Sequence, residues 1–259
     1  MDYFFLFYIL YNNIWVVTMK KSIFLSIFGI LCASFLGFFV ITKVNQKEAL
    51  PEVIYYVPHQ DDELLTFGAS IYDHIVKGHD VYVVLLTDGA ASYVRDVLNM
   101  SEEEFTEARN REFDAAIEVL GVPLEHVEKK GYPDRGLLVE QVEEIIKEYH
   151  TRFPRAHHKA TSYLDPHPDH ASAGLALKNL MDKGLIENGQ FYFGYSYTPE
   201  GVEIKEDDYD ESYYPVIIAA SLEYKIEDSE SGRYGIGWRS VGKAFRLLEE
   251  DPISRYHEY

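Results

Sequence analysis

Two short clusters of histidine and aspartate carry the chemistry that this sequence can be expected to perform. The first cluster is residues 58–63, Pro-His-Gln-Asp-Asp-Glu. His59 and Asp62 are three residues apart at the start of a predicted helix, so both side chains lie on one side of its first turn. An imidazole and a carboxylate are good ligands for zinc or a similar divalent metal. Asp61 points elsewhere and is free to act as a base.

The second cluster is residues 165–170, Asp-Pro-His-Pro-Asp-His. It follows a short apolar piece, Thr161–Leu164, which we interpret as a strand, and it precedes a helical run, Ala171–Met181. His170 offers a third ligand, which leaves one coordination position open for water. That is the pattern of a catalytic zinc site, whereas structural sites are closed by four protein ligands. Acids at a helix N-terminus or histidines on a surface loop would explain one cluster, but not two matched ones.

The elements around the clusters indicate how they come together. A short apolar run, Val53–Val57, ends at the first cluster, as a buried parallel strand does at the edge of a sheet. In open α/β sheets, ligands bind outside the carboxyl ends of the strands. Alternating strands and helices predict a single three-layer, Rossmann-like α/β domain with a mainly parallel sheet over residues 52–259. The predicted elements are strands 53–57, 81–86, 161–164 and 190–195 and helices 64–77, 101–120, 138–149 and 171–181.

The two clusters resemble the signature pair of the PIG-L/LmbE-like N-acetylglucosaminyl deacetylases. Between them, Val83–Gly89 resembles the second strand of that family with its Thr-Asp-Gly turn, and Ala108–Gly121 resembles its Arg- and Glu-bearing helix. The resemblance runs from Val53 to Leu180. Gln60 departs from it, because the family has Pro there, and so does Asp165, where some sugar deacetylases of the family have Tyr.

The resemblance implies a zinc-dependent hydrolase that removes the N-acetyl group from an N-acetylglucosamine-type amino sugar or glycoconjugate. His59, Asp62 and His170 would bind the metal, which lowers the pKa of its water to about 7. Two histidines and one carboxylate also suit iron, so Fe²⁺ is an alternative. The expected partner is therefore a small-molecule amino sugar or glycoconjugate substrate.

The same resemblance assigns roles to five further residues. Asp61 would take the proton of the attacking water, and His167 would face the oxyanion as it develops. Asp169 would orient one of the ligand histidines. Arg109 and Asp134 would contact the substrate.

Composition excludes several other classes of protein. The 259 residues carry a formal net charge of -19, which repels phosphate backbones and argues against a nucleic-acid partner. The one cysteine, Cys32, excludes an intrachain disulfide and a cysteine-rich zinc site. The oligomeric state is not indicated.

The N-terminal part is of a different kind. Residues 1–22 combine what we interpret as an over-extended start with a basic segment beginning at Met19. Residues 23–41 form an uncharged apolar run. Its length is close to that of a helix that spans a bilayer, which needs about 20 residues. Residues 42–51 form a polar linker. No good signal-peptidase site precedes Lys43, so we expect a transmembrane or signal-anchor helix with the catalytic domain outside the cytoplasm. If the segment is cleaved, the domain is secreted.

Two rival functions remain open at this stage. One is a metal-dependent amidase that acts on a non-sugar amide. The other is a non-catalytic, membrane-tethered glycan-binding domain, against which the spare base Asp61 argues.

Overall fold

The computed structural model describes residues 49–195 and 197–259. Its compact unit, Leu50–Tyr259, holds the whole predicted catalytic domain. The predicted anchor at residues 23–41 lies outside the described residues, and within them no helix is long and apolar enough to cross a membrane.

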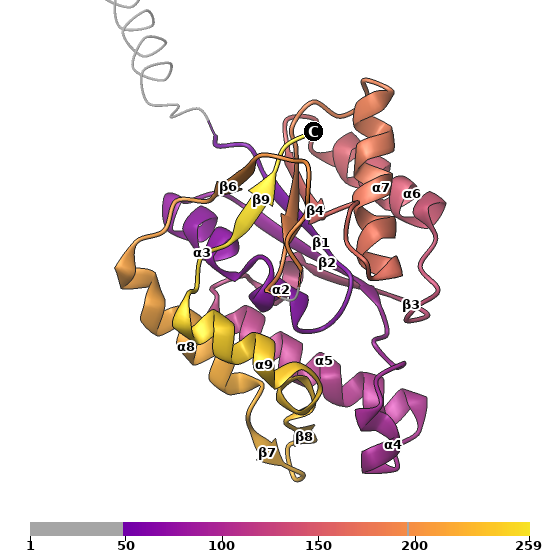
Figure 1. The fold of residues 1–259 in the computed structure, drawn as a ribbon, viewed down its shortest axis with the longest axis vertical. Helices are drawn as coiled ribbons and strands as arrows, with labels where there is room; N and C mark the ends of the chain where they lie inside the picture. The colour runs from indigo at the N-terminus through magenta and orange to yellow at the C-terminus, as the bar shows by residue number, and fades with distance from the viewer. Residues whose placement is uncertain (1–48, 196) are drawn as a thin grey trace, which may run out of the picture. The chain divides into compact units, whose positions relative to one another are not determined.

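Within residues 50–259, the main strands form one seven-stranded sheet in the order β3-β2-β1-β4-β5-β9-β6 (Figure 1). The first five of these strands are parallel, and β9 runs antiparallel to both β5 and β6. The mainly parallel α/β sheet is therefore confirmed. The strands are β1 (Val53–Val57), β2 (Val81–Thr87), β3 (Val127–Tyr132), β4 (His157–Thr161), β5 (Gly189–Phe193), β6 (Ile204–Glu206) and β9 (Arg255–His257), with a separate hairpin of β7 (Glu227–Asp228) and β8 (Arg233–Tyr234).

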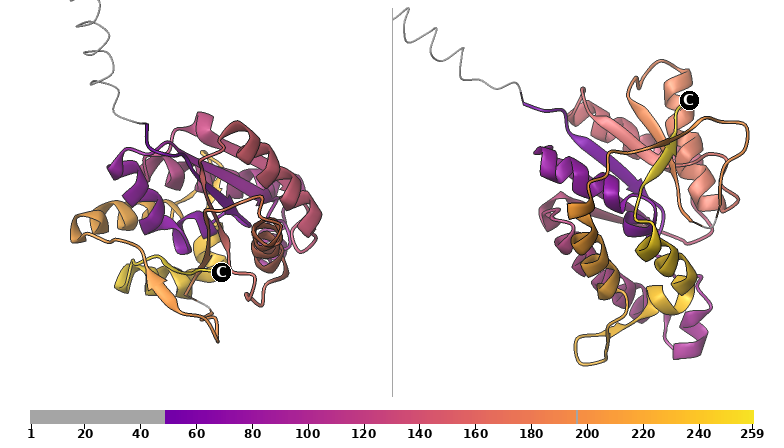
Figure 2. Two further views of the ribbon diagram at one scale, coloured as in Figure 1. Left: turned by 90° about the horizontal axis from the view of Figure 1, so that it is seen from above. Right: turned by 60° about the vertical axis from the view of Figure 1, so that its left-hand side comes forward.

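Helices cover both faces of the sheet (Figure 2). Successive residues of a strand face opposite sides, and β1 accordingly contributes Tyr55 to one buried cluster and Tyr56 to the other. The Tyr55 side packs against α3, α5, α8 and α9, and the Tyr56 side packs against α6 and α7. The helices are α2 (Asp62–Leu65), α3 (Gly68–Lys77), α4 (Val94–Leu98), α5 (Glu102–Val119), α6 (Val139–Arg152), α7 (Pro168–Asp182), α8 (Tyr214–Glu223) and α9 (Ile236–Glu250).

Local signals set several of the boundaries. Ser101 and Glu104 form a reciprocal capping box at the start of α5, in which each backbone N–H donates to the side chain of the other residue. Helix α3 ends at Gly78, whose φ of 86° a residue with a side chain adopts only with strain. Both ends were predicted from the sequence.

Two predicted elements differ from those in the structure. The helix expected over residues 64–77 is divided into α2 and α3. The strand expected over residues 161–164 lies earlier, at β4. The sequence did not indicate this position, because most residues of the buried strand are polar. His158 and Lys159 are each about as buried as the apolar core, at 1% and 2% exposed. His158 is paired with Tyr56, and the ammonium of Lys159 with Tyr192.

Helix α7 packs closely against the end of β4 at Gly174. A Cβ on Gly174 would lie 2.3 Å from the Tyr163 amide nitrogen and 2.4 Å from the Thr161 carbonyl oxygen. Because these contacts are backbone atoms, the helix itself would have to move. The site residue His170 is one turn earlier on the same helix, so Gly174 fixes its distance from the sheet.

We expect Gly174→Ala to destabilise the protein by about 1–3 kcal/mol, the usual range for overpacking. Thermal unfolding checks this value. Gly242→Ala on α9 is the matched control, because its Cβ would make only ordinary contacts from 3.6 Å upward. An equal loss of stability in both variants would show that Gly174 has no special packing role.

Candidate metal centre

The two His/Asp clusters meet at one edge of the sheet. The first lies on the turn between β1 and α2, and the second on the turn between β4 and α7. Strands β1 and β4 are neighbours, but the chain continues from β1 toward β2 and from β4 toward β5. Their following turns therefore diverge and leave a crevice at the carboxyl ends of the strands, the usual ligand site in open α/β sheets.

Three donor atoms converge in this crevice. The Asp62 Oδ2 atom lies 3.1 Å from His59 Nδ1 and 3.0 Å from His170 Nε2, and the two nitrogens are 3.2 Å apart. Four-coordinate zinc with bonds of about 2.0–2.1 Å places its ligands about 3.3 Å from one another. The spacing of this trio therefore suits a single small cation after only slight adjustment.

The far nitrogens of the two histidines face other carboxylates. His59 Nε2 lies 3.1 Å from Asp169 Oδ2 and 3.3 Å from Asp134 Oδ1. His170 Nδ1 lies 3.1 Å from Asp165 Oδ2. A proton on each far nitrogen would then be donated to a carboxylate, which leaves the near nitrogen with a free lone pair. Metal-ligating histidines are held in this way.

Charge in the crevice favours a cation. Burial lowers the pKa of the His170 imidazole, but the Asp62 and Asp165 carboxylates outweigh burial and raise it to about 9. Burial likewise opposes ionisation of Asp62, yet the neighbouring His170 and His59 hold its pKa well below the usual range. The carboxylates that stabilise a proton on these histidines would stabilise a divalent metal in its place.

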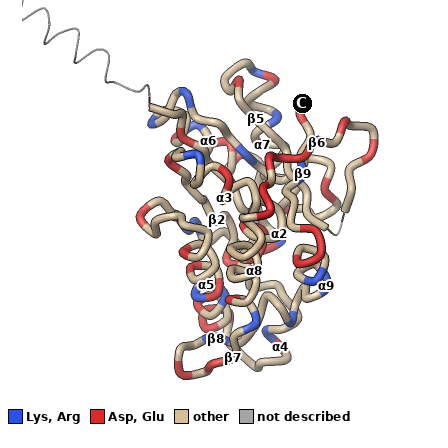
Figure 3. Tube along the Cα trace, turned by 90° about the vertical axis from the view of Figure 1, so that its left-hand side faces the viewer, with Lys and Arg blue, Asp and Glu red and all other residues tan. Residues whose placement is uncertain are grey.

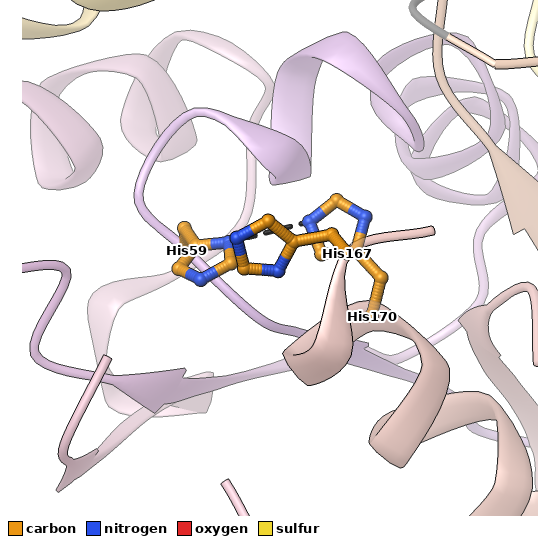
Figure 4. Close-up of side chains that lie close together, drawn as sticks. All are labelled: His59, His167 and His170. Carbon is orange, nitrogen blue, oxygen red and sulfur yellow. Dashed lines mark hydrogen bonds between the residues drawn. The ribbon is translucent and has the colours of Figure 1, made fainter. Parts of the chain in front are cut away.

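His167 joins the group from the start of α7. Nitrogens of His59, His167 and His170 lie within 4.8 Å of one another, and a second set of donors at the same spacing comprises His59, Asp134, His167 and Asp169. Figure 4 shows the three imidazole rings gathered at one point of the site. The His167 Nδ1 atom accepts the Asp169 amide at 3.3 Å, so the ring proton sits on Nε2.

Asp61 is buried, and only one of its two carboxylate oxygens is hydrogen-bonded to a described residue. Its Oδ2 accepts from the Arg109 guanidinium at 3.0 Å. Among the described residues no group hydrogen-bonds to Oδ1, yet this atom is not sealed from solvent. Burial raises the pKa of the Asp61 carboxyl to about 7, although the positive charge of Arg109 opposes the shift. A base with a pKa near the operating pH is suited to proton transfer.

Arg109, one of the two predicted substrate-binding residues, is buried beside Asp61. Its side chain is 5% exposed, and its terminal nitrogens donate to the carbonyl oxygens of Gly89 and Gln60 and to Asp61. This placement makes Arg109 a partner of Asp61, and its direct contact with substrate stays a prediction. Asp134, the other expected substrate residue, lies behind His59, where the Ala91 amide donates to its second oxygen at 3.0 Å.

Asp169 has the orienting position expected of it. Besides contacting His59, its carboxylate accepts the backbone amides of Arg135 at 2.6 Å and Leu137 at 3.1 Å. These two bonds tie the loop after β3 to the first turn of α7. The sequence interpretation gave no such role to Asp165, which lies against His170 in the same way. A carboxylate on the same turn as a ligand histidine was the signal available.

We expect Asp165→Asn to weaken zinc binding about 10- to 100-fold, the usual effect of losing a carboxylate behind a ligand histidine. The amide preserves the size of the side chain but cannot hold the imidazole with a negative charge. Competition with a chromophoric chelator measures the affinity. An unchanged affinity would mean that Asp165 does not orient His170.

Outside the crevice the surface is acidic. Figure 3 shows Asp and Glu spread over several elements, including β6 and the tip between β7 and β8. Many of the described lysines and arginines are paired with these carboxylates, as Lys205 is with Glu258 at 2.6 Å and Arg239 with Glu227 at 2.7 Å. The tip and the β6 segment contribute no donor to the converging histidines, so their charge is best explained as solvated surface.

Comparison with known proteins finds one matching family and several solved structures of similar fold. The sequence model of the GlcNAc-PI de-N-acetylase (PIG-L) family matches residues 54–181. A deacetylase of the teicoplanin biosynthetic pathway, solved as a triple mutant, is 18% identical over 80% of this chain and 97% of its own, with a TM-score of 0.59. The N,N'-diacetylchitobiose deacetylase of Pyrococcus horikoshii is 20% identical over 78% of each chain, with a TM-score of 0.56.

The same fold also occurs in a protein with another activity. The 4-carboxy-2-hydroxymuconate hydratase GalB of Pseudomonas putida is 20% identical over 80% of this chain and 95% of its own, with a TM-score of 0.54. Among curated proteins no match was found. At these identities the structural likenesses show the fold alone.

Proposed function

The chain belongs to the GlcNAc-PI de-N-acetylase (PIG-L) family, and we propose that it is a zinc-dependent hydrolase that removes the N-acetyl group from an N-acetylglucosamine-type amino sugar or glycoconjugate. One observation carries the proposal. Three donors from two turns converge to within 3.2 Å of one another, and Asp61 beside them has a carboxylate oxygen to which none of the described residues hydrogen-bonds. A site that only binds metal needs no such base.

His59, Asp62 and His170 would hold the metal. Two imidazoles and one carboxylate are the protein ligands of several catalytic zinc sites, and Fe²⁺ accepts the same set. When bound, the cation supplies Lewis-acid activation of a water molecule and of the acetyl oxygen.

The residues around these ligands divide the proton transfers between them. Asp61 takes the proton of the attacking water through its free oxygen and later delivers a proton to the departing amine. Arg109 holds the Asp61 carboxylate in place by its hydrogen bond of 3.0 Å. His167, with its proton on Nε2, donates to the oxyanion that develops on the acetyl oxygen. Asp169, Asp134 and Asp165 keep the two ligand histidines oriented.

Acetate release tests this function directly. The purified full chain is assayed against a panel of N-acetylglucosamine compounds, metal-free and after loading with zinc or iron. Acetate release that depends on the metal and follows saturation kinetics is the expected result. One tightly bound zinc ion without acetate from any sugar would turn the assignment toward another amide or toward a binding role.

We also propose that residues 23–41 anchor the protein in a membrane with the catalytic domain outside the cytoplasm. The uncharged apolar run and the two lysines before it support this proposal. Protease digestion of intact cells tests the location. Protection of the catalytic domain from external protease would refute it.

A further inference from the structure

Asp61 has an unusual backbone conformation. Its φ of 127° is positive, a region that residues with side chains rarely adopt. Such a conformation is strained and persists only where the surroundings fix it. Arg109 fixes the carboxylate, but a side-chain contact alone does not determine the backbone.

Glu63 fixes the backbone. Its Oε2 atom accepts the Asp61 amide at 2.9 Å. The Glu63 side chain is fully buried, so bulk solvent does not orient it. The direction of its carboxylate must come from a protein partner.

That partner is Tyr224, which immediately follows α8. Its hydroxyl donates to Glu63 Oε1 at 2.6 Å, and the residue is 1% exposed. Gly237 of α9 presses on the ring, because a Cβ there would lie 2.5 Å from Tyr224 Cδ1. Gly237 is in turn held through its amide by the buried Glu112 at 3.0 Å. Tyr224 is therefore held at the end of α8 with its ring packed against α9, and its hydroxyl is directed at Glu63.

We propose that Tyr224 is a positioning residue, which sets the backbone of Asp61 through Glu63 and thereby aims the carboxylate that acts as base. The inference rests on the proposed function, in which Asp61 accepts the proton. It also means that the segment after residue 181, beyond the match to the family, completes the reactive site. None of the metal-binding donors comes from that segment, so its contribution is confined to the base.

A purely structural tyrosine would give a different result, and the chain offers a matched control. Tyr149 is 2% exposed and donates to Glu128 Oε2 at 3.0 Å. This second Tyr–Glu pair joins α6 to β3 on the other face of the sheet, with the tyrosine buried and the Glu128 side chain 40% exposed. Tyr149→Phe therefore deletes the same hydroxyl and the same kind of bond without a link to Asp61.

The test compares Tyr224→Phe with Tyr149→Phe in the zinc-loaded full chain. We expect Tyr224→Phe to lower kcat for acetate release about 10- to 100-fold, since misplacement of a reacting group by about 1 Å has effects of that order. KM and zinc affinity should stay within about twofold of the wild type, because neither the pocket nor the metal donors change. Tyr149→Phe should leave kcat unchanged. Hydrogen exchange at the Asp61 amide, followed by NMR, should accelerate only in Tyr224→Phe.

Two outcomes would overturn the inference. One is an unchanged kcat in Tyr224→Phe, and the other is an Asp61 amide that stays as protected as in the wild type. A wild-type protein that releases no acetate would instead refute the proposed function. The exchange rates of the Asp61 amide in the two variants would then still decide whether Tyr224 holds that backbone. Glu63→Gln, which retains an acceptor for Tyr224 but presents an amide to Asp61, should reproduce the exchange result.

Discussion

Asp61→Asn is expected to lower kcat about 10³-fold while zinc remains bound, because an amide cannot accept the proton that the carboxylate takes. Asparagine tolerates a positive φ better than most residues, so the backbone that Glu63 holds should be kept. The three converging donors are on other residues and should keep their spacing. Acetate-release kinetics together with zinc analysis of the same preparation measure both effects.

The free energy of unfolding should distinguish two replacements of Asp61. Asp61→Ala leaves the buried Arg109 without its anion, and breaking a buried ion pair in this way costs about 3–5 kcal/mol. Asp61→Asn should cost less, because its amide oxygen still accepts from Arg109. Asp114→Asn serves as the control, since Asp114 pairs with Lys129 near the surface of α5, with side chains 31% and 33% exposed. Near-normal turnover in Asp61→Asn would remove Asp61 from the mechanism.

His170→Ala is expected to abolish both metal binding and acetate release. His170 Nε2 is one corner of the trio, 3.0 Å from Asp62 and 3.2 Å from His59. Loss of this corner leaves two protein ligands where catalytic zinc sites have three. Zinc content should fall from about one ion per chain to background, as measured by elemental analysis after dialysis.

The control for this variant is a histidine at the opposite end of the sheet. His126 immediately precedes β3 at its amino end, where its imidazole contacts the Val81 carbonyl oxygen at 3.2 Å. His126→Ala should retain zinc and turnover. Full zinc content in His170→Ala would place the metal on the second set of donors, which includes Asp134 and Asp169.

The sequence predicts those parts of the fold in which local pattern and tertiary environment agree. Strand β1 has the predicted limits, Val53–Val57, because all five of its residues are buried and all are apolar or aromatic. The capping box at Ser101 and the glycine that ends α3 are local signals and were read correctly. Strand β4 was misplaced because Lys159 is buried against Tyr192 and Gln190, residues about thirty positions later.

The candidate site divides in the same way. The spacing within each cluster is local, so the sequence alone could suggest that His59, Asp62 and His170 share a crevice. Arg109 could not be placed from its helical position, because its partner Asp61 lies 48 residues earlier. Tyr224 lies 161 residues from Glu63 in sequence, and no spacing rule connects residues that far apart.

The position of β9 in the sheet has a consequence for biosynthesis. Strand β6 pairs with β9 and not with β5, so β9 lies between two strands that leave the ribosome before it. Until β9 has left the ribosome, the edge of β5 has no neighbour on that side. Unpaired strand edges attract other chains, so nascent molecules on the same messenger RNA are most prone to associate during this interval. Slow codons in residues 204–254 should therefore lower the soluble yield.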